Sequence, residues 1–163
     1  MLKQSLILAA LVAMSGCDPR SPTKEAPKVS ALPQPDTFRA EVLFDFERAE
    51  LGGEGRKLLD ELARELVASD IERLTATAHT DRIGGAAYNE ELAARRAEAI
   101  RDYLVGKGVP VDLLQVEGKG AREPVTAGRC DGLGPENKQN AKLIACLRPD
   151  RRAVIEVRQR AAR

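Results

Sequence analysis

Two oppositely charged side chains, Asp81 and Arg96, are the strongest candidates in the sequence for a binding site. Asp81 follows an apolar, strand-like run, and Arg96 comes fifteen residues later in an amphipathic helical pattern, after a Gly-Gly turn. A carboxylate accepts hydrogen bonds from an ammonium group, and a guanidinium binds a carboxylate through two parallel hydrogen bonds. Backbone N–H groups at a helix N-terminus add further donors for an anion. The pair therefore predicts a site for a zwitterionic ligand.

Segments with apolar periodicity are expected to position this pair, and their order predicts the fold class. The sequence predicts strands over residues 41–46, 71–78, 113–117 and 153–157, and helices over residues 54–69, 86–106 and 135–147, the last of them short. This order predicts an α/β (α+β) fold, a βαβαβ(α)β two-layer sandwich with the helices packed on one face of a mixed four-stranded sheet.

The expected core is mainly aliphatic, because the chain has no Trp, two Tyr and three Phe. Apolar residues recur at helical spacing in both long helices, which indicates one buried stripe on each. The predicted core residues are Val42, Leu43, Phe44 and Phe46 in the first strand, Leu58, Leu59, Leu62, Leu66 and Val67 in the first helix, and Leu92, Ala99, Ile100, Tyr103 and Leu104 in the second.

The first 36 residues are expected to lie outside the folded domain. Residues 1–16 have a Lys near the start and a short apolar run, which is typical of an export signal. The sequence Met-Ser-Gly-Cys that ends at Cys17 resembles the lipobox of bacterial lipoproteins, in which the cysteine is lipidated; an unmodified Cys17 after a plain signal peptide is the alternative. The proline-rich residues 17–36 predict a tether of roughly 60 Å, and residues 37–163 form the domain.

The three cysteines support this arrangement. An exported protein with an odd number of cysteines leaves one unpaired. If Cys17 carries lipid, Cys130 and Cys146 remain as an even pair, and we expect them to form a disulfide in an oxidising compartment. No metal site is expected, because two thiols and a single histidine, distant in the sequence, make a poor set of ligands.

Charge and residue types argue against several classes of function. The net charge of +1 lacks the basic bias of nucleic-acid-binding proteins. His79 has no second histidine and no nucleophile beside it in the pattern, so it is interpreted as structural. We therefore expect neither catalytic residues nor a cofactor.

Several motifs together resemble one family. The segments are L-F-D-F-E-R-A-E-L from Leu43, A-H-T-D-R-I-G-x-x-x-Y-N-x-x-L-x-x-x-R-A-E-A-I-R-D-Y-L from Ala78, V-E-G-K-G from Val116 and D-R-R-A-V-I-E-V from Asp150. They resemble the OmpA-like peptidoglycan-binding domain of Pal-type lipoproteins and of OmpA C-termini, over residues 38–157. Two positions near the pocket depart from the family pattern, with Ala93 where Ser is frequent and Asp150 where Asn is frequent.

The resemblance implies non-covalent binding of the diaminopimelate residue in the peptidoglycan stem peptide. The binding residues that it implies are Asp81, Arg96, Asn89, Leu92, Thr80 and Arg152. With a lipid on Cys17, the protein would tether a membrane to the cell wall, with the domain in the periplasm. Asp18 resembles an inner-membrane retention signal of enteric bacteria, whereas Pal-like proteins are commonly tethered to the outer membrane, which we expect here.

Two alternatives remain open from the sequence. The first is a protein-interaction subunit of an envelope or secretion complex, for which the irregular insertion of residues 118–147 is a candidate partner surface. The second is a hydrolase of the cell wall, which the lack of a nucleophile with a base, a metal cluster or a carboxylate pair disfavours.

Overall fold

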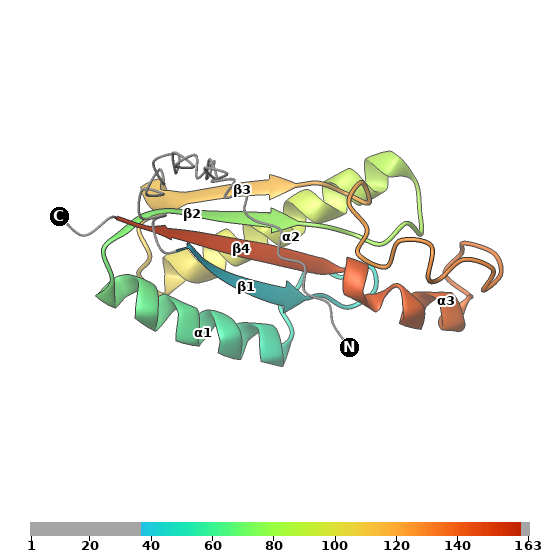
Figure 1. The fold of residues 1–163 in the computed structure, drawn as a ribbon, viewed down its shortest axis with the longest axis horizontal. Helices are drawn as coiled ribbons and strands as arrows, with labels where there is room; N and C mark the ends of the chain where they lie inside the picture. Colours follow the sequence, from blue (N-terminus) through green and yellow to red (C-terminus); the bar gives the residue numbers. More distant parts are fainter. Residues whose placement is uncertain (1–36, 161–163) are drawn as a thin grey trace, which may run out of the picture. The chain divides into compact units, whose positions relative to one another are not determined.

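A computed structural model describes residues 37–160, so the predicted export signal, Cys17 and the predicted tether lie outside the described residues. Four strands form one mixed sheet in the order β1-β4-β2-β3 (Figure 1). The central strand β4 is antiparallel to both β1 and β2, and β3 lies parallel to β2 at the edge. The strands are β1 (Thr37–Leu43), β2 (Ile71–Ala78), β3 (Leu114–Gly118) and β4 (Arg152–Gln159). The predicted mixed four-stranded sheet is therefore confirmed.

Two long helices supply the second layer of the sandwich. They are α1 (Gly53–Ala68) and α2 (Ala86–Gly106), and a short α3 (Ala141–Cys146) precedes β4; single 3₁₀ turns cover Val111–Leu113 (η1) and Arg148–Asp150 (η2). Alternate residues of the sheet, such as Leu74, Ala76 and Ala78 in β2, form one buried cluster with apolar residues of both long helices. This period of two is what a half-buried strand requires. The predicted order βαβαβ(α)β is confirmed.

Some predicted boundaries and core positions were wrong. The first strand ends at Leu43, so Phe44 and Phe46 belong to the following loop, although Phe44 is buried. Leu43 is 40% exposed and Val67 is 61% exposed, and neither joins the core. Leu43 faces away from the helices because it alternates with the buried Val42. The short helix begins at Ala141 instead of residue 135, since Asn140 caps it by accepting a hydrogen bond from the Leu143 N–H.

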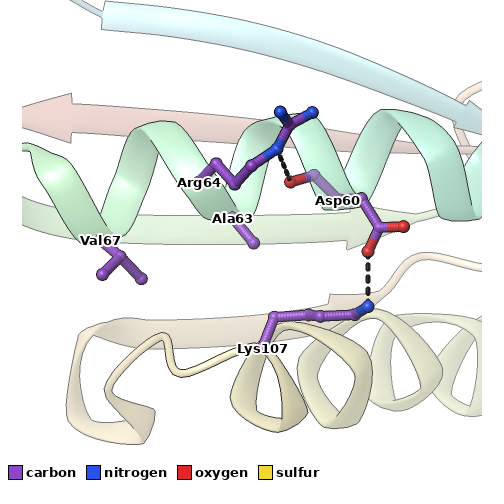
Figure 2. Close-up of a pocket in the computed structure, with 5 residues that line it drawn as sticks. All are labelled: Asp60, Ala63, Arg64, Val67 and Lys107. Carbon is purple, nitrogen blue, oxygen red and sulfur yellow. Dashed lines mark hydrogen bonds and ion pairs between the residues drawn. The ribbon is translucent and has the colours of Figure 1, made fainter.

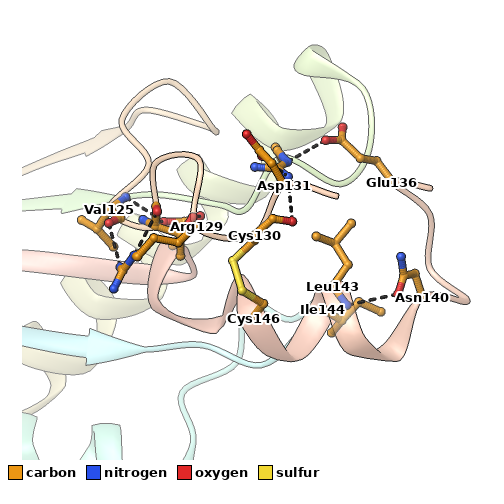
Figure 3. The surroundings of a disulfide bond; sticks show 12 residues. Val125, Arg129, Cys130, Asp131, Glu136, Asn140, Leu143, Ile144 and Cys146 are labelled. Atoms are coloured by element: carbon orange, nitrogen blue, oxygen red, sulfur yellow. Dashed lines mark hydrogen bonds and ion pairs between the residues drawn. A yellow bond between two sulfur atoms is a disulfide. The ribbon is translucent and has the colours of Figure 1, made fainter. Parts of the chain in front are cut away.

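The β3–β4 connection, residues 119–151, is held by its own small core. Cys130 and Cys146 form a disulfide within it, and Figure 3 shows this bond beside α3. Cys130, Leu143 and Leu147 pack with Ile83, which lies outside the connection in the β2–α2 loop. The connection is therefore packed against the loop that follows Asp81.

Within residues 37–160, no helix combines the length and the apolar character needed to cross a bilayer.

The edge strand β3 lies unusually close to α2 at Gly118. A Cβ atom added to Gly118 would lie 2.4 Å from the backbone nitrogen of Ala94 and 2.8 Å from the backbone carbon of Ala93. Both contacts are with helix backbone, which cannot rotate away. A residue without a side chain is therefore required here for the helix to pack on the sheet.

We predict that Gly118→Ala lowers the free energy of unfolding by about 1–3 kcal/mol, because the added methyl group forces α2 away from β3. Urea denaturation measured by circular dichroism tests this. Gly53→Ala is the matched control, since its Cβ would meet nothing within 4 Å, and it should leave stability unchanged or raise it slightly. Equal stability of Gly118→Ala and the wild type would contradict the close approach.

Candidate functional site

Asp81 lies directly beyond β2, and its carboxylate is almost fully buried. One carboxylate oxygen accepts a hydrogen bond from the Ile83 N–H at 3.0 Å, which fixes the start of the β2–α2 loop. The other forms a buried ion pair with the Arg151 guanidinium, also at 3.0 Å. Arg151 in turn donates to the backbone carbonyls of Phe44 and Ile144. Asp81 is thus paired within the protein, but with Arg151 and not with Arg96.

Arg96 is wholly buried beneath the same site. Its Nε, Nη1 and Nη2 atoms donate to the backbone carbonyls of Arg48, His79 and Asp45 at 2.8, 2.8 and 3.0 Å. The guanidinium also lies 5.0 Å from the centre of the Phe44 ring, a favourable arrangement for a cation. Burial lowers the pKa of Arg96 to about 10, although the nearby charge of Asp81 acts in the opposite direction. Arg96 therefore remains charged at neutral pH.

The charges of this cluster do not cancel. Asp81 contributes one negative charge, whereas Arg96 and Arg151 contribute two positive charges, and all three side chains are buried. A guanidinium has five N–H donors, and the hydrogen bonds of Arg96 use three of them. Two donors of Arg96 remain, so the cluster has both the charge and the donors to accept an anionic group.

The residues predicted to bind ligand surround a small, narrow cavity, with one exception. The cavity has a volume of about 10 Å³, which is the size of a single water molecule. It is lined by the predicted residues Thr80, Asp81, Asn89, Leu92 and Arg96, and by Phe46, Glu47, Ile83, Tyr88 and Arg151, which were not predicted. The structure therefore brings five of the six predicted residues together.

Arg152 is the exception, because its side chain does not line the cavity. Its Nη2 atom donates to the carbonyl of Glu123, in the β3–β4 connection. Ala153, Ile155 and Val157 face the helices, so a period of two places Arg151 on that face and Arg152 on the other. If the alternation of Ala153, Ile155 and Val157 is extended by two residues toward the N-terminus, the sequence itself predicts that Arg151, and not Arg152, faces the site.

Comparisons with known proteins identify the family of the chain. Residues 43–139 match the OmpA family. The chain belongs to the OmpA family. It is 42% identical to outer membrane protein A of Shigella flexneri over 141 residues, and 44% identical to outer membrane protein A of Escherichia fergusonii over 124 residues. These matches cover 82% and 75% of this chain but only 39% and 49% of the relatives.

A solved structure extends the comparison. The fold resembles the crystal structure of the peptidoglycan-associated lipoprotein from Burkholderia pseudomallei, with a TM-score of 0.60 and 26% sequence identity. The match covers 72% of this chain and 89% of that chain. The OmpA family is one of structural and binding domains, and these comparisons indicate no catalytic family.

The loop between β1 and α1, residues 44–52, supplies residues of the cavity that the sequence pattern did not indicate. Phe46 and Glu47 both line the cavity, and the Phe46 ring lies 5.8 Å from the Arg151 guanidinium. Arg96 holds this loop in place by its bonds to the carbonyls of Asp45 and Arg48. Irregular loops have no periodicity, so only the tertiary contacts reveal these positions.

The two departures from the family pattern have structural roles outside the cavity. Ala93 is wholly buried where α2 meets β3. The Asp150 carboxylate accepts hydrogen bonds from the N–H groups of Val125 and Thr126 and from the Thr126 hydroxyl, at 2.6–2.9 Å. Asp150 therefore fixes the β3–β4 connection and does not line the predicted site.

The other pockets are weaker candidates for a binding site. One of about 570 Å³ lies between α1 and the C-terminal end of α2 (Figure 2). Its lining residues include Asp60 and Lys107, which form an ion pair with each other at 2.7 Å. Among the described residues, no group of three or more His, Cys, Asp or Glu side chains could hold a metal ion.

His79 is buried behind the site, and its Nδ1 atom has no hydrogen-bond partner among the described residues. Burial lowers the pKa of His79, and the positive charge of Arg152 lowers it further. Because the folded state resists protonation of this imidazole, the unfolded state binds the proton first as the pH falls through about 6.5. His79 therefore makes the fold less stable in mild acid.

We predict that the free energy of unfolding of the wild type falls more steeply between pH 7 and 5.5 than that of His79→Gln. The difference in slope is at most about 1.4 kcal/mol per pH unit, the value for one proton. Urea titrations of both proteins at several pH values measure it. Carboxylates contribute equally to both curves, so identical slopes would show that His79 titrates normally in the folded protein.

Proposed function

We propose that this protein binds peptidoglycan non-covalently through the diaminopimelate of the stem peptide, and that it tethers a membrane to the cell wall. The observation that carries the proposal is the buried cluster of Asp81, Arg96 and Arg151, with its net positive charge and the free donors of Arg96. Similarity to a peptidoglycan-associated lipoprotein supports the choice of ligand.

The chemistry of diaminopimelate fits this cluster. Its side chain ends in an ammonium and a carboxylate on one carbon atom. Asp81 accepts from the ammonium, and the remaining N–H groups of Arg96 donate to the carboxylate. The Thr80 hydroxyl is buried at the cavity and has no partner within the described residues. An unsatisfied buried hydroxyl is costly, and a ligand that supplies a partner removes that cost.

Binding requires the cavity to widen, because about 10 Å³ holds one water and not an amino-acid side chain. Arg96 and Arg151 are fixed by buried hydrogen bonds to backbone carbonyls. The side formed by Glu47 and Tyr88 is partly exposed to solvent. We infer that the ligand enters from this side, while the arginines keep their positions.

The attachment to a membrane rests on residues outside the described part of the chain. We propose that residues 1–16 are removed, that Cys17 carries the lipid, and that residues 17–36 are the tether to the domain of residues 37–163. The sequence at Cys17 supports lipidation, and similarity to outer membrane protein A supports the outer membrane as the location. The inner membrane, which Asp18 would favour, is the alternative that membrane fractionation tests.

We predict that Asp81→Asn weakens binding of the full-length protein to purified sacculi by about 10- to 100-fold. The substitution keeps the shape of the side chain but removes the charge, and a hydrogen bond between charged groups contributes about 1.5–3 kcal/mol. A pull-down with sacculi over a range of protein concentrations measures the change. Circular dichroism must show that the variant is folded, since the substitution also leaves Arg151 without its partner.

Two controls make this test specific. Asp102→Asn removes a carboxylate from an exposed position on α2 and should bind like the wild type. Free diaminopimelate should displace the wild-type protein from sacculi, whereas lysine, which lacks the second carboxylate, should not. If folded Asp81→Asn binds as tightly as the wild type, or if free diaminopimelate does not compete, the proposed ligand is wrong.

A further inference from the structure

A second pocket lies next to the small cavity at Asp81 and shares part of its lining. It has a volume of about 310 Å³ and is lined by Glu47, Ile83, Gly84, Gly85, Tyr88, Glu136, Asn137 and Lys138. Glu47, Ile83 and Tyr88 also line the small cavity at Asp81. The two spaces are therefore adjacent, and the second has room for a further residue of a ligand that reaches Asp81.

One wall of this pocket, residues 136–138, belongs to the β3–β4 connection and is firmly held. The Arg82 guanidinium forms ion pairs with Asp131 at 2.9 Å and with Glu136 at 2.6 Å. Figure 3 shows Asp131 and Glu136 close together beside the disulfide of Cys130 and Cys146. Ile83 of the β2–α2 loop also packs against the buried Cys130 and Leu143, and this buried contact, more than the exposed ion pairs, positions the wall relative to that loop.

The opposite wall is the β1–α1 loop, and a single ion pair joins the two. Lys138 Nζ lies 2.9 Å from a carboxylate oxygen of Glu47. The two side chains are 66% and 35% exposed, and exposed pairs of this kind contribute about 0–1 kcal/mol. A ligand can therefore separate Lys138 from Glu47 at little cost.

Glu47 also has an unusual backbone. Its φ angle is 56°, in the left-handed region, which costs a residue with a side chain roughly 1–2 kcal/mol. Such conformations persist where the surrounding structure imposes them, often at ligand sites. Here Arg96 donates to the carbonyls of Asp45 and Arg48, on either side of Glu47. These bonds fix the loop around Glu47, whose side chain lines both spaces.

We propose that the 310 Å³ pocket is a second subsite for the wall peptide, and that the peptide enters by exchanging the Glu47–Lys138 ion pair for two of its own. The ammonium of the ligand side chain approaches Glu47 as it passes toward Asp81. Lys138, once released, binds the carboxylate of the peptide main chain. During entry both side chains are paired with the ligand, which carries both signs. Once the ammonium reaches Asp81, Lys138 keeps the main-chain carboxylate, and Glu47, which is partly exposed, is solvated.

This inference rests on the proposed function, and its test separates the two. The probes are two versions of the tripeptide that ends in diaminopimelate, one with a free main-chain carboxylate and one with that carboxylate amidated. The side-chain zwitterion is identical in both. Isothermal titration calorimetry measures their affinities for the full-length wild type, for Lys138→Met and for Lys142→Met, a control that removes an exposed charge from α3 of the same connection.

We expect the wild type and Lys142→Met to prefer the free carboxylate by about three- to fivefold, the range of one partly exposed ion pair. Lys138→Met should bind both tripeptides equally, and it should still lose binding when Asp81→Asn is added. A preference that persists in Lys138→Met, or its absence from the wild type, would overturn the subsite while the Asp81 site stands. Failure of the wild type to bind either tripeptide would refute the proposed function, and the subsite with it.

Discussion

The buried guanidinium of Arg96 is the interaction on which the site depends. From α2 it donates to one carbonyl at the end of β2 and to two carbonyls of the β1–α1 loop. Three segments distant in the sequence are thereby fixed around one charge. Burial of a charge is costly unless hydrogen bonds replace part of its hydration, so the three carbonyls stabilise the arginine while the arginine orders the loops. Arg96 is consequently both a structural residue and a candidate ligand contact.

This dual role explains how the charged groups of the site can be in position before a ligand binds, although the cavity is too small to hold one. The Asp81–Arg151 ion pair and the bonds of Arg96 fix the charged groups in advance, and preorganised groups lose little freedom on binding. The movable side is the one that joins Glu47 to Lys138 through an exposed ion pair. Charged groups in fixed positions beside a side that can move fit the proposed function, in which a zwitterion is distinguished from other peptide groups.

Much of the fold was predictable from local pattern. The periodic stripes located α1 and α2 within one residue of their observed starts, and alternation located β2. Leu43 was misassigned because it alternates with the buried Val42 and so faces away from the helices, and Val67 is exposed although the adjacent Leu66 is buried. The β3–β4 connection has no periodicity, so its order comes from the disulfide, Asp150 and Arg82.

The sequence by itself determined the layer order, the family resemblance and five of the residues at the cavity, because periodicity and linear motifs are local properties. Only the tertiary structure decided that Asp81 pairs with Arg151 and that Glu47 and Lys138 meet. Those facts depend on contacts between loops that are far apart along the chain. The alternation of β4 indicates that Arg151 and not Arg152 faces the helices, but neither residue type nor spacing reveals that Asp81 is its partner.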